Sequence, residues 1–346
     1  MAFLQNARYQ EAYDLGFDVR GTIITGINGK GEFDTYRNAL QSNPEISSIA
    51  GSRGGIFSDR MHEAVSYASR QAEVDIIEVG DEYLSTMGLD LKAGRDFIKD
   101  SETDLRESVI ITENMARLFG WQDALGKELI WRDTMRLNVV GIVRDVYTQG
   151  LWREMEPMMI RYVSPESYTQ LIVRTSADKL SSVNTFMDER WSEVFPTRLY
   201  SGYLMVRGLQ EATRLNMSIT SGYAFLGSMA LLLSVTGLYA LVSLNMMRRI
   251  KEIGIRKIVG ASISGIAQKV NREFIIILGI ASVFGSYAGY MWCNTLMPSI
   301  WKYYQGVGLS TFVIAVLVML TVSLAAIAFR VFNIASTNPV NTLRDE

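Results

Sequence analysis

The sequence predicts an α+β domain outside the membrane, followed by an all-α bundle of three transmembrane helices. A charge-rich stretch extends to about residue 214, and the remainder is dominated by long hydrophobic runs. Three of these runs, residues 215–247, 274–301 and 303–329, contain no charged side chain. Each exceeds the roughly 20 apolar residues that a helix needs to cross about 30 Å of hydrocarbon. We therefore expect spans at about residues 220–247, 274–297 and 310–332.

The distribution of positive charge predicts the orientation. The loop between the second and third spans contains only Lys302, whereas the loop after the first span is strongly basic. Its basic residues are Arg248, Arg249, Lys251, Arg256, Lys257, Lys269 and Arg272. Because short loops rich in Lys and Arg remain in the cytoplasm, the sequence predicts a cytoplasmic C-terminus and an extracytoplasmic N-terminal domain, residues 1–214.

The predicted elements of this N-terminal domain follow the order of a split βαβ, or ferredoxin-like, unit. The expected order is strand 20–27, helix 32–41, strand 46–52, a long insertion, strand 168–175, a helix ending at 195 and strand 198–206. We expect a split lobe made of residues 18–53 and 162–206, with residues 54–161 inserted as a second lobe.

The insertion contains the strand, helix and helix-termination signals of a separate α/β lobe. Strands are predicted at residues 74–79, 108–112 and 136–143, and helices at 81–87 and 113–119. Gly88 and Gly120 follow the two helices, where glycine favours termination. Residues 1–17, ahead of the first strand, have apolar side chains at mostly helical spacing and predict an amphipathic helix.

Composition argues against several classes of function. The chain has 34 Lys and Arg against 36 Asp and Glu, so it lacks the concentrated positive charge of a nucleic-acid binding face. The single Cys293 lies in the second span, and the single His62 has no second His or Cys to complete a metal site. We predict no catalytic, cofactor-binding or metal-binding residues on this chain.

The basic loop is the main candidate functional site, as a docking surface for a cytoplasmic protein. Charged and apolar side chains alternate there so that a short helix would have one apolar face and one charged face. The predicted site consists of Arg248, Arg249, Lys251, Glu252, Ile253, Gly254, Ile255, Arg256, Lys257, Gly260, Ala261 and Ser262. The alternative interpretation is an ordinary cytoplasmic anchor whose cations neutralise lipid phosphates.

The second span contains small residues at every fourth position. Ala281, Gly285 and Gly289 form a stripe on one helical face, which suits close helix packing. No Asp, Glu, Lys, Arg or His interrupts the three hydrophobic runs, residues 215–247, 274–301 and 303–329. Such residues mark ion and proton pathways, so the sequence disfavours an ion-coupled secondary transporter.

Several motifs resemble those of a known family. The sequence KEIGIRKIVGAS at residues 251–262 is similar to the cytoplasmic signature of FtsX-like permeases, the membrane subunits of ATP-binding-cassette (ABC) systems of the MacB type. MGLDLKAGRDF at 87–97, VIITE at 109–113, LFGW at 118–121 and LGK at 125–127 resemble a MacB-like periplasmic core domain. NPVNTLR at 338–344 resembles the cytoplasmic C-terminal ending of the family.

The resemblance implies an inner-membrane permease that works as a homodimer, or as a pseudo-dimer with a sister half. It would transmit ATP-driven motion to its outer domain for export or extrusion of a substrate. The sequence contains no G-x-x-x-x-G-K-[ST] motif for phosphate binding, so ATP hydrolysis is expected on a separate subunit.

Alternatives from the same family remain. One is a non-transporting FtsX-type regulator of an envelope partner such as a cell-wall hydrolase, and another is a lipoprotein-releasing permease. The resemblance also implies four spans, with the core domain between the first and second. We therefore expect that this chain starts inside a longer permease, just after its first span.

Overall fold

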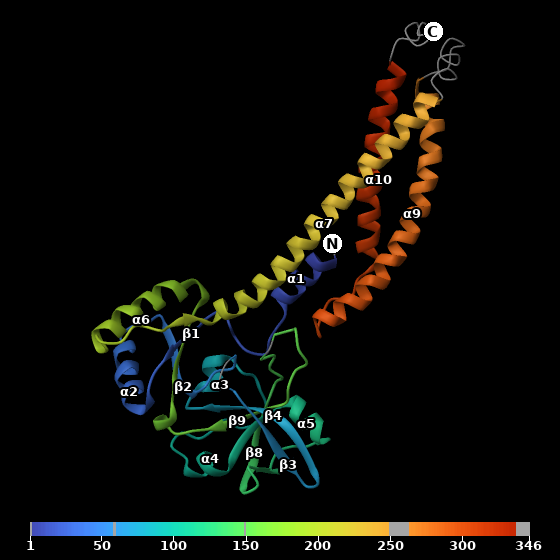
Figure 1. Ribbon diagram of the computed structural model, residues 1–346. Helices are drawn as coiled ribbons and strands as arrows, with labels where there is room; N and C mark the ends of the chain where they lie inside the picture. Colours follow the sequence, from blue (N-terminus) through green and yellow to red (C-terminus); the bar gives the residue numbers. More distant parts are fainter. Residues whose placement is uncertain (1, 58–59, 149, 249–262, 337–346) are drawn as a thin grey trace. The chain divides into compact units, whose positions relative to one another are not determined.

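The computed structural model describes residues 2–57, 60–148, 150–248 and 263–336 (Figure 1). The chain divides into two compact units. The α/β unit is Ala12–Arg214, and the membrane unit combines Met1–Glu11 with Leu215–Glu346. Residues before Ala12 were expected in the N-terminal domain. They group with the membrane unit because Phe3 stacks on Tyr223, with ring centroids 4.3 Å apart.

The split lobe of the α/β unit has the predicted order of elements. They are β1 (Thr22–Gly26), α2 (Gly29–Leu40), β2 (Ile46–Arg53), β10 (Gln170–Thr175), α6 (Leu180–Val194) and β11 (Tyr203–Leu204). Short 3-10 turns, Pro165–Ser167 and Ala177–Lys179, flank β10. The strands lie antiparallel in the order β11–β1–β10–β2. This is the ferredoxin-like arrangement, so the predicted fold class is confirmed.

Helices α2 and α6 pack on this sheet through a shared apolar core. Tyr36 of α2 and Trp191 of α6 are fully buried, with ring centroids 5.0 Å apart. The Tyr36 hydroxyl donates a hydrogen bond of 2.7 Å to the carbonyl oxygen of Met187. This bond satisfies a buried polar group that would otherwise destabilise the core.

The inserted lobe is a ring of strands. Its strands are β3 (Met61–Tyr67), β4 (Arg70–Val79), β5 (Leu91–Gly94), β6 (Ser108–Thr112), β7 (Glu128–Trp131), β8 (Met135–Val143) and β9 (Met158–Tyr162). The pairings run β4–β3–β7–β8–β6–β9 and return from β9 to β4, while β5 pairs with β8. Trp131, Leu129, Val109 and Ile76 lie among the buried residues of its core. We call this the ring lobe.

The helices of the insertion are α3 (Tyr83–Met87), which packs against β2 and β10 of the split lobe, α4 (Glu102–Glu107) and α5 (Glu113–Phe119). Gly88 and Gly120 end α3 and α5 with φ values of 67° and 74°, as glycine at these positions predicts. The sequence pattern does not predict β3, β5, β7, β9 and α4. β5 and β7 have four residues each and α4 has six. β3 has only Val65 fully buried, and β9 (Met158–Tyr162) contains one β-branched residue, so the local pattern does not indicate these strands.

Two predicted boundaries are wrong. Helix α1 is Ala2–Ala12 and ends five residues before Phe17. Gly16 has a φ of +85°, which ends the helical path before Phe17. The strand predicted at residues 198–206 is only β11, because Met205 already begins α7 (Met205–Arg248).

An ion pair anchors α4 to the loop after β5. Arg95 contacts the buried Asp104 through two hydrogen bonds of 2.8 Å. These bonds lower the pKa of Asp104 from 3.8 to about 2, and the Ile98 amide and the Ser108 hydroxyl contribute by donating hydrogen bonds to the same carboxylate. Because the folded pKa lies below the unfolded value, the ionised carboxylate stabilises the fold above pH 3.8. That contribution disappears as the pH falls toward 2.

We therefore expect Asp104→Asn to lower the free energy of unfolding by about 2 kcal/mol at pH 7. The difference from the unsubstituted protein should shrink between pH 5 and about pH 2. Denaturant unfolding at several pH values measures this. Asp133→Asn, at an exposed carboxylate without an ion pair among the described residues, is the control. A difference that persisted at the lowest pH would contradict the ionic origin.

The membrane unit contains α1 and three long helices: α7, α9 (Ile263–Ile300) and α10 (Leu309–Ser336). Within the described residues, three helical stretches are long and apolar enough to cross a membrane: Met217–Asn245, Ile275–Ile300 and Leu309–Phe329. The three predicted spans are therefore confirmed. Large apolar side chains such as Phe225, Phe284 and Phe329 are 65–70% exposed, as expected for a surface that faces lipid.

Candidate functional site

Only one residue of the predicted docking loop falls within the described part of the chain. Arg248 is the last residue of α7, and its side chain is exposed. The rest of the loop lies outside the described residues: Arg249, Lys251, Glu252, Ile253, Gly254, Ile255, Arg256, Lys257, Gly260, Ala261 and Ser262. Its docking role remains a prediction from sequence.

The small-residue stripe on α9 is only partly covered by the chain itself. A Cβ atom at Gly289 would lie 3.5 Å from the Phe312 ring of α10, which is ordinary van der Waals contact. At Gly285 a Cβ atom would meet nothing within 4 Å, and Ala281 is exposed. The part of the stripe at Ala281 and Gly285 is thus open to another helix, and the role of the stripe in packing remains a prediction.

Polar and aromatic contacts hold α1 in the membrane unit. The Gln305 amide donates to Asn6 Oδ1 at 3.0 Å, and the Thr311 hydroxyl donates to Gln5 Oε1 at 2.7 Å. Phe3 also packs edge-on against Trp301, with centroids 5.7 Å apart. These contacts tie α1 to the segment that joins α9 and α10.

The α/β unit begins with a short segment that docks on the ring lobe. We call residues 13–17 the N-terminal connector. The Tyr147 amide, which follows β8, donates to the Leu15 carbonyl at 2.9 Å. The hydroxyl of Tyr13 donates to that of Tyr147 at 2.9 Å, and the rings meet edge-on at 5.1 Å. Backbone and side-chain contacts therefore attach the connector to a loop whose Tyr147 is 134 residues from Tyr13 in sequence.

Gly16 allows the N-terminal connector to lie close to the backbone at Asp145. Its φ of +85° is in the left-handed region, and a Cβ atom there would lie 2.1 Å from the Asp145 carbonyl oxygen. Any other residue would push the two segments apart. The Gly16 amide donates to Asp14 Oδ1, and Arg144 pairs with the same carboxylate, so both lower the pKa of Asp14.

The chain then reaches the split lobe at Asp18. Its carboxylate pairs with Arg174 of β10, and its amide donates to the Met87 carbonyl at 2.8 Å. Arg174 also donates to the Thr86 carbonyl at 3.2 Å. Residues 13–18 thus link the ring lobe, α3 and the split-lobe sheet.

The other end of the α/β unit leaves from the split lobe. Strand β11 lies at the sheet edge, with Ile23 opposite Leu204 and Ile24 opposite Tyr203. Helix α7 follows at Met205, whose side chain is 1% exposed. We call residues 203–205 the C-terminal connector. The two connectors therefore attach to different lobes, the first mainly to the ring lobe and the second to the split lobe.

The described residues contain no group of three or more His, Cys, Asp or Glu side chains that could hold a metal ion. His62, expected on the surface, is half exposed, and its Nδ1 lies 3.1 Å from Oδ1 of the buried Asp75. Arg60 and Thr148 contact the same carboxylate. The Asp75 cluster has the form of a structural polar network.

Comparison with known families assigns both units. Residues 9–187 match the MacB-like periplasmic core domain, and residues 224–339 match the C-terminal region of FtsX-like permeases. The chain belongs to the FtsX-like permeases with a MacB-like periplasmic core domain. This FtsX-like permease is therefore a membrane protein with an extracytoplasmic N-terminal domain.

Individual relatives are distant. A macrolide export ATP-binding/permease protein MacB from Sodalis glossinidius is 24% identical over 81% of this chain and 45% of the relative. MacB from Neisseria gonorrhoeae is 26% identical over 64% of this chain and 36% of the relative. The FtsX-like permease thus spans less than half the length of these relatives.

Among solved structures, the periplasmic region of MacB from Actinobacillus actinomycetemcomitans has a TM-score of 0.41 and 17% identity, covering 61% of this chain and 98% of that one. The extracellular domain of the ABC-type transporter YknZ from Gram-positive bacteria has a TM-score of 0.38 and 18% identity, covering 53% and 99%.

Sequence reasoning missed the connectors of this FtsX-like permease. Residues 13–17 had been included in an amphipathic helix. The Asp14-Leu15-Gly16 sequence carried a turn signal, because Asp commonly accepts the amide two residues later and Gly tolerates positive φ. Its partner, the segment around Tyr147, could not be identified from local pattern.

Proposed function

We propose that this chain is the permease subunit of an ABC transporter that passes the motion of a separate ATPase to the α/β unit, for export or extrusion of a substrate. The observation that carries this proposal is the attachment of the two connectors to two different lobes. A displacement of one connector relative to the other then acts across the junction between the lobes.

The lobe junction suits such a movement. Strands β2 and β4 pair only at Ser52 with Val79 and at Arg53 with Glu78. One more backbone bond, from the Gly80 amide to the Gly51 carbonyl at 2.9 Å, lies beside them. A strand junction with few backbone hydrogen bonds between two well-packed lobes is a common place for hinge motion.

The cytoplasmic part of the proposal rests on the basic loop. Helix α7 runs from the C-terminal connector to Arg248, where the loop begins. In this proposal the loop binds an ABC ATPase. The spans contain no charged residues that would support an ion-coupled mechanism.

The proposed assembly is a homodimer, or a pseudo-dimer with a sister permease half, in a bacterial inner membrane with the C-terminus in the cytoplasm. The open part of the α9 stripe, at Ala281 and Gly285, is suited to a helix from the second subunit. A periplasmic partner is a further expectation from the family, and no cofactor is expected on this chain itself.

The test uses the chain with its ATPase in lipid nanodiscs. Purification from native membranes should recover a P-loop ATPase. Gly260→Val, or Glu252→Lys together with Arg256→Glu, should leave membrane insertion intact but separate ATP hydrolysis from export. A side chain at Gly260 would obstruct a close approach, and the charge exchange would reverse local complementarity while conserving net charge.

A matched control is Arg190→Glu with Glu193→Arg, which exchanges an exposed ion pair on α6 in the same way. It should preserve coupling. Normal coupling in both loop variants would show that the loop acts only as a positive anchor. Recovery of no P-loop ATPase would count against the transporter role as a whole.

A further inference from the structure

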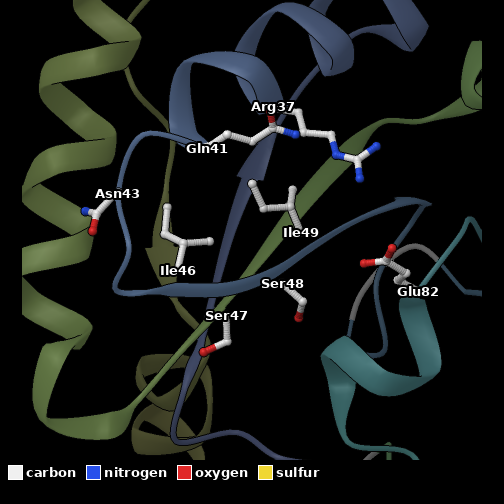
Figure 2. Close-up of a pocket in the computed structure, with 8 residues that line it drawn as sticks. All are labelled: Arg37, Gln41, Asn43, Ile46, Ser47, Ser48, Ile49 and Glu82. Carbon is white, nitrogen blue, oxygen red and sulfur yellow. The ribbon is translucent and has the colours of Figure 1, made fainter.

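We infer that a surface cavity in the α/β unit binds a zwitterionic α-amino acid with a polar side chain. The cavity has a volume of about 220 Å³ and lies between α2, the beginning of β2 and the start of α3 (Figure 2). This volume is below the roughly 300 Å³ lower limit of drug-sized sites, so it suits a ligand of amino-acid size.

Two opposite charges line the cavity without neutralising each other. Arg37 comes from α2 and Glu82 from the residue before α3. Within the described part of the chain, neither side chain takes part in an ion pair, although many other arginines of the α/β unit do. Figure 2 shows both charged groups at the same end of the view, directed toward the space between the two helices. The site therefore offers separate partners for an anion and a cation.

An α-amino acid matches this pair of charges. The planar fork of an arginine binds a carboxylate through two parallel hydrogen bonds. A glutamate accepts hydrogen bonds from an ammonium group. In this inference a single ligand contacts Arg37 through its carboxylate and Glu82 through its ammonium, two groups that an α-amino acid joins through one carbon atom.

Glu82 is held in a defined position. Its backbone is in the left-handed region, with φ 59° and ψ 11°, which is unfavourable for a residue other than glycine. Neighbouring bonds maintain this conformation: the Thr86 amide donates to the Glu82 carbonyl at 2.9 Å, and Asp81 accepts the Tyr162 hydroxyl. These bonds fix the backbone position from which the exposed Glu82 side chain projects.

The edge of β2 supplies the polar wall. Four consecutive residues, 46–49, line the cavity, so the strand presents its edge there rather than one face. Ser47 lies at a register shift, between Ile46 opposite Thr175 and Ser48 opposite Arg174. The Ser47 hydroxyl and the backbone groups on this edge, with the side-chain amide of Gln41, can bind a polar side chain.

The test measures binding by isothermal titration calorimetry to the full chain in nanodiscs. The probes are L-glutamine, L-asparagine and L-serine, with N-acetyl-L-glutamine lacking the ammonium, L-glutaminamide lacking the carboxylate, and the dipeptide L-alanyl-L-glutamine. We expect at least one free amino acid to bind with a Kd below about 1 mM. The two blocked forms should bind at least tenfold more weakly.

Two substitutions identify the site. Arg37→Gln and Glu82→Gln should each weaken the binding at least tenfold, and Arg37→Lys should retain part of it because the charge remains. Arg20→Gln and Glu73→Gln are controls, since both are exposed residues of the α/β unit away from this cavity. Thermal unfolding of every variant establishes that it is folded.

Three results would overturn the inference. The first is the absence of binding by all free amino acids at 10 mM. The second is equal binding of L-glutamine and its blocked forms. The third is unchanged affinity in both cavity variants. Tighter binding of the dipeptide than of any free amino acid would also contradict the inference. It would mean that the cavity binds the end of a peptide chain and not a free amino acid. None of these measurements depends on an ATPase, so the proposed transport role is tested independently.

Discussion

Gly16→Val is expected to release the N-terminal connector from the ring lobe. The new Cβ atom would lie 2.1 Å from the Asp145 carbonyl oxygen, and the valine would have to adopt a φ of +85°. Both demands are met only if residues 13–17 move away, which breaks the bond between the Tyr147 amide and the Leu15 carbonyl. Hydrogen exchange of the Tyr147 amide should become at least tenfold faster in the variant.

The same variant tests transmission. With the connector detached, the transporter proposal predicts that ATP hydrolysis continues while export is lost. Gly126→Val is the matched control: Gly126 has a φ of +73°, but a Cβ atom there would meet nothing within 4 Å. It imposes similar backbone strain without displacing the connector. If Gly16→Val released Tyr147 but left export intact, motion would not pass through this segment.

Gly80→Ala should destabilise the junction between the two lobes. A Cβ atom at Gly80 would lie 1.7 Å from the hydroxyl oxygen of Tyr168, and one at Gly51 would lie 2.1 Å from the same ring. Tyr168 is 2% exposed and packs against Phe33 at 5.0 Å, so it has little room to move. We expect a loss of about 3 kcal/mol in the free energy of unfolding, and a Tm lower by about 6–12 °C.

Two comparisons test whether the Tyr168 side chain is what obstructs the new methyl group at position 80. Gly31→Ala, in α2 and in open space, should stabilise the protein by about 0.5–1 kcal/mol, because alanine loses less entropy in a helix. Adding Tyr168→Ala to Gly80→Ala should cost less than the sum of the two single losses. Simple additivity would mean that the ring is not what obstructs the new methyl group.

The elements that could be predicted share a local cause. The three spans follow from long uncharged runs, and α5 ends at Phe119 because Gly120 favours the left-handed conformation. Strand β6, Ser108–Thr112, is predicted with the observed bounds because most of its residues are β-branched. The order strand, helix, strand on either side of the insertion was enough to predict the split lobe.

The tertiary structure decided the features that depend on partners far apart in the chain. Asp18 meets Arg174 across 156 residues, and Tyr13 meets Tyr147 across 134. The ring lobe closes because β9 pairs with β4 in parallel, a register that no local period specifies. The cavity at Arg37 and Glu82 exists only because α2 and the start of α3 meet the edge of β2. A sequence pattern indicates the conformational preference of one short segment. These sites depend instead on which distant segments pack together.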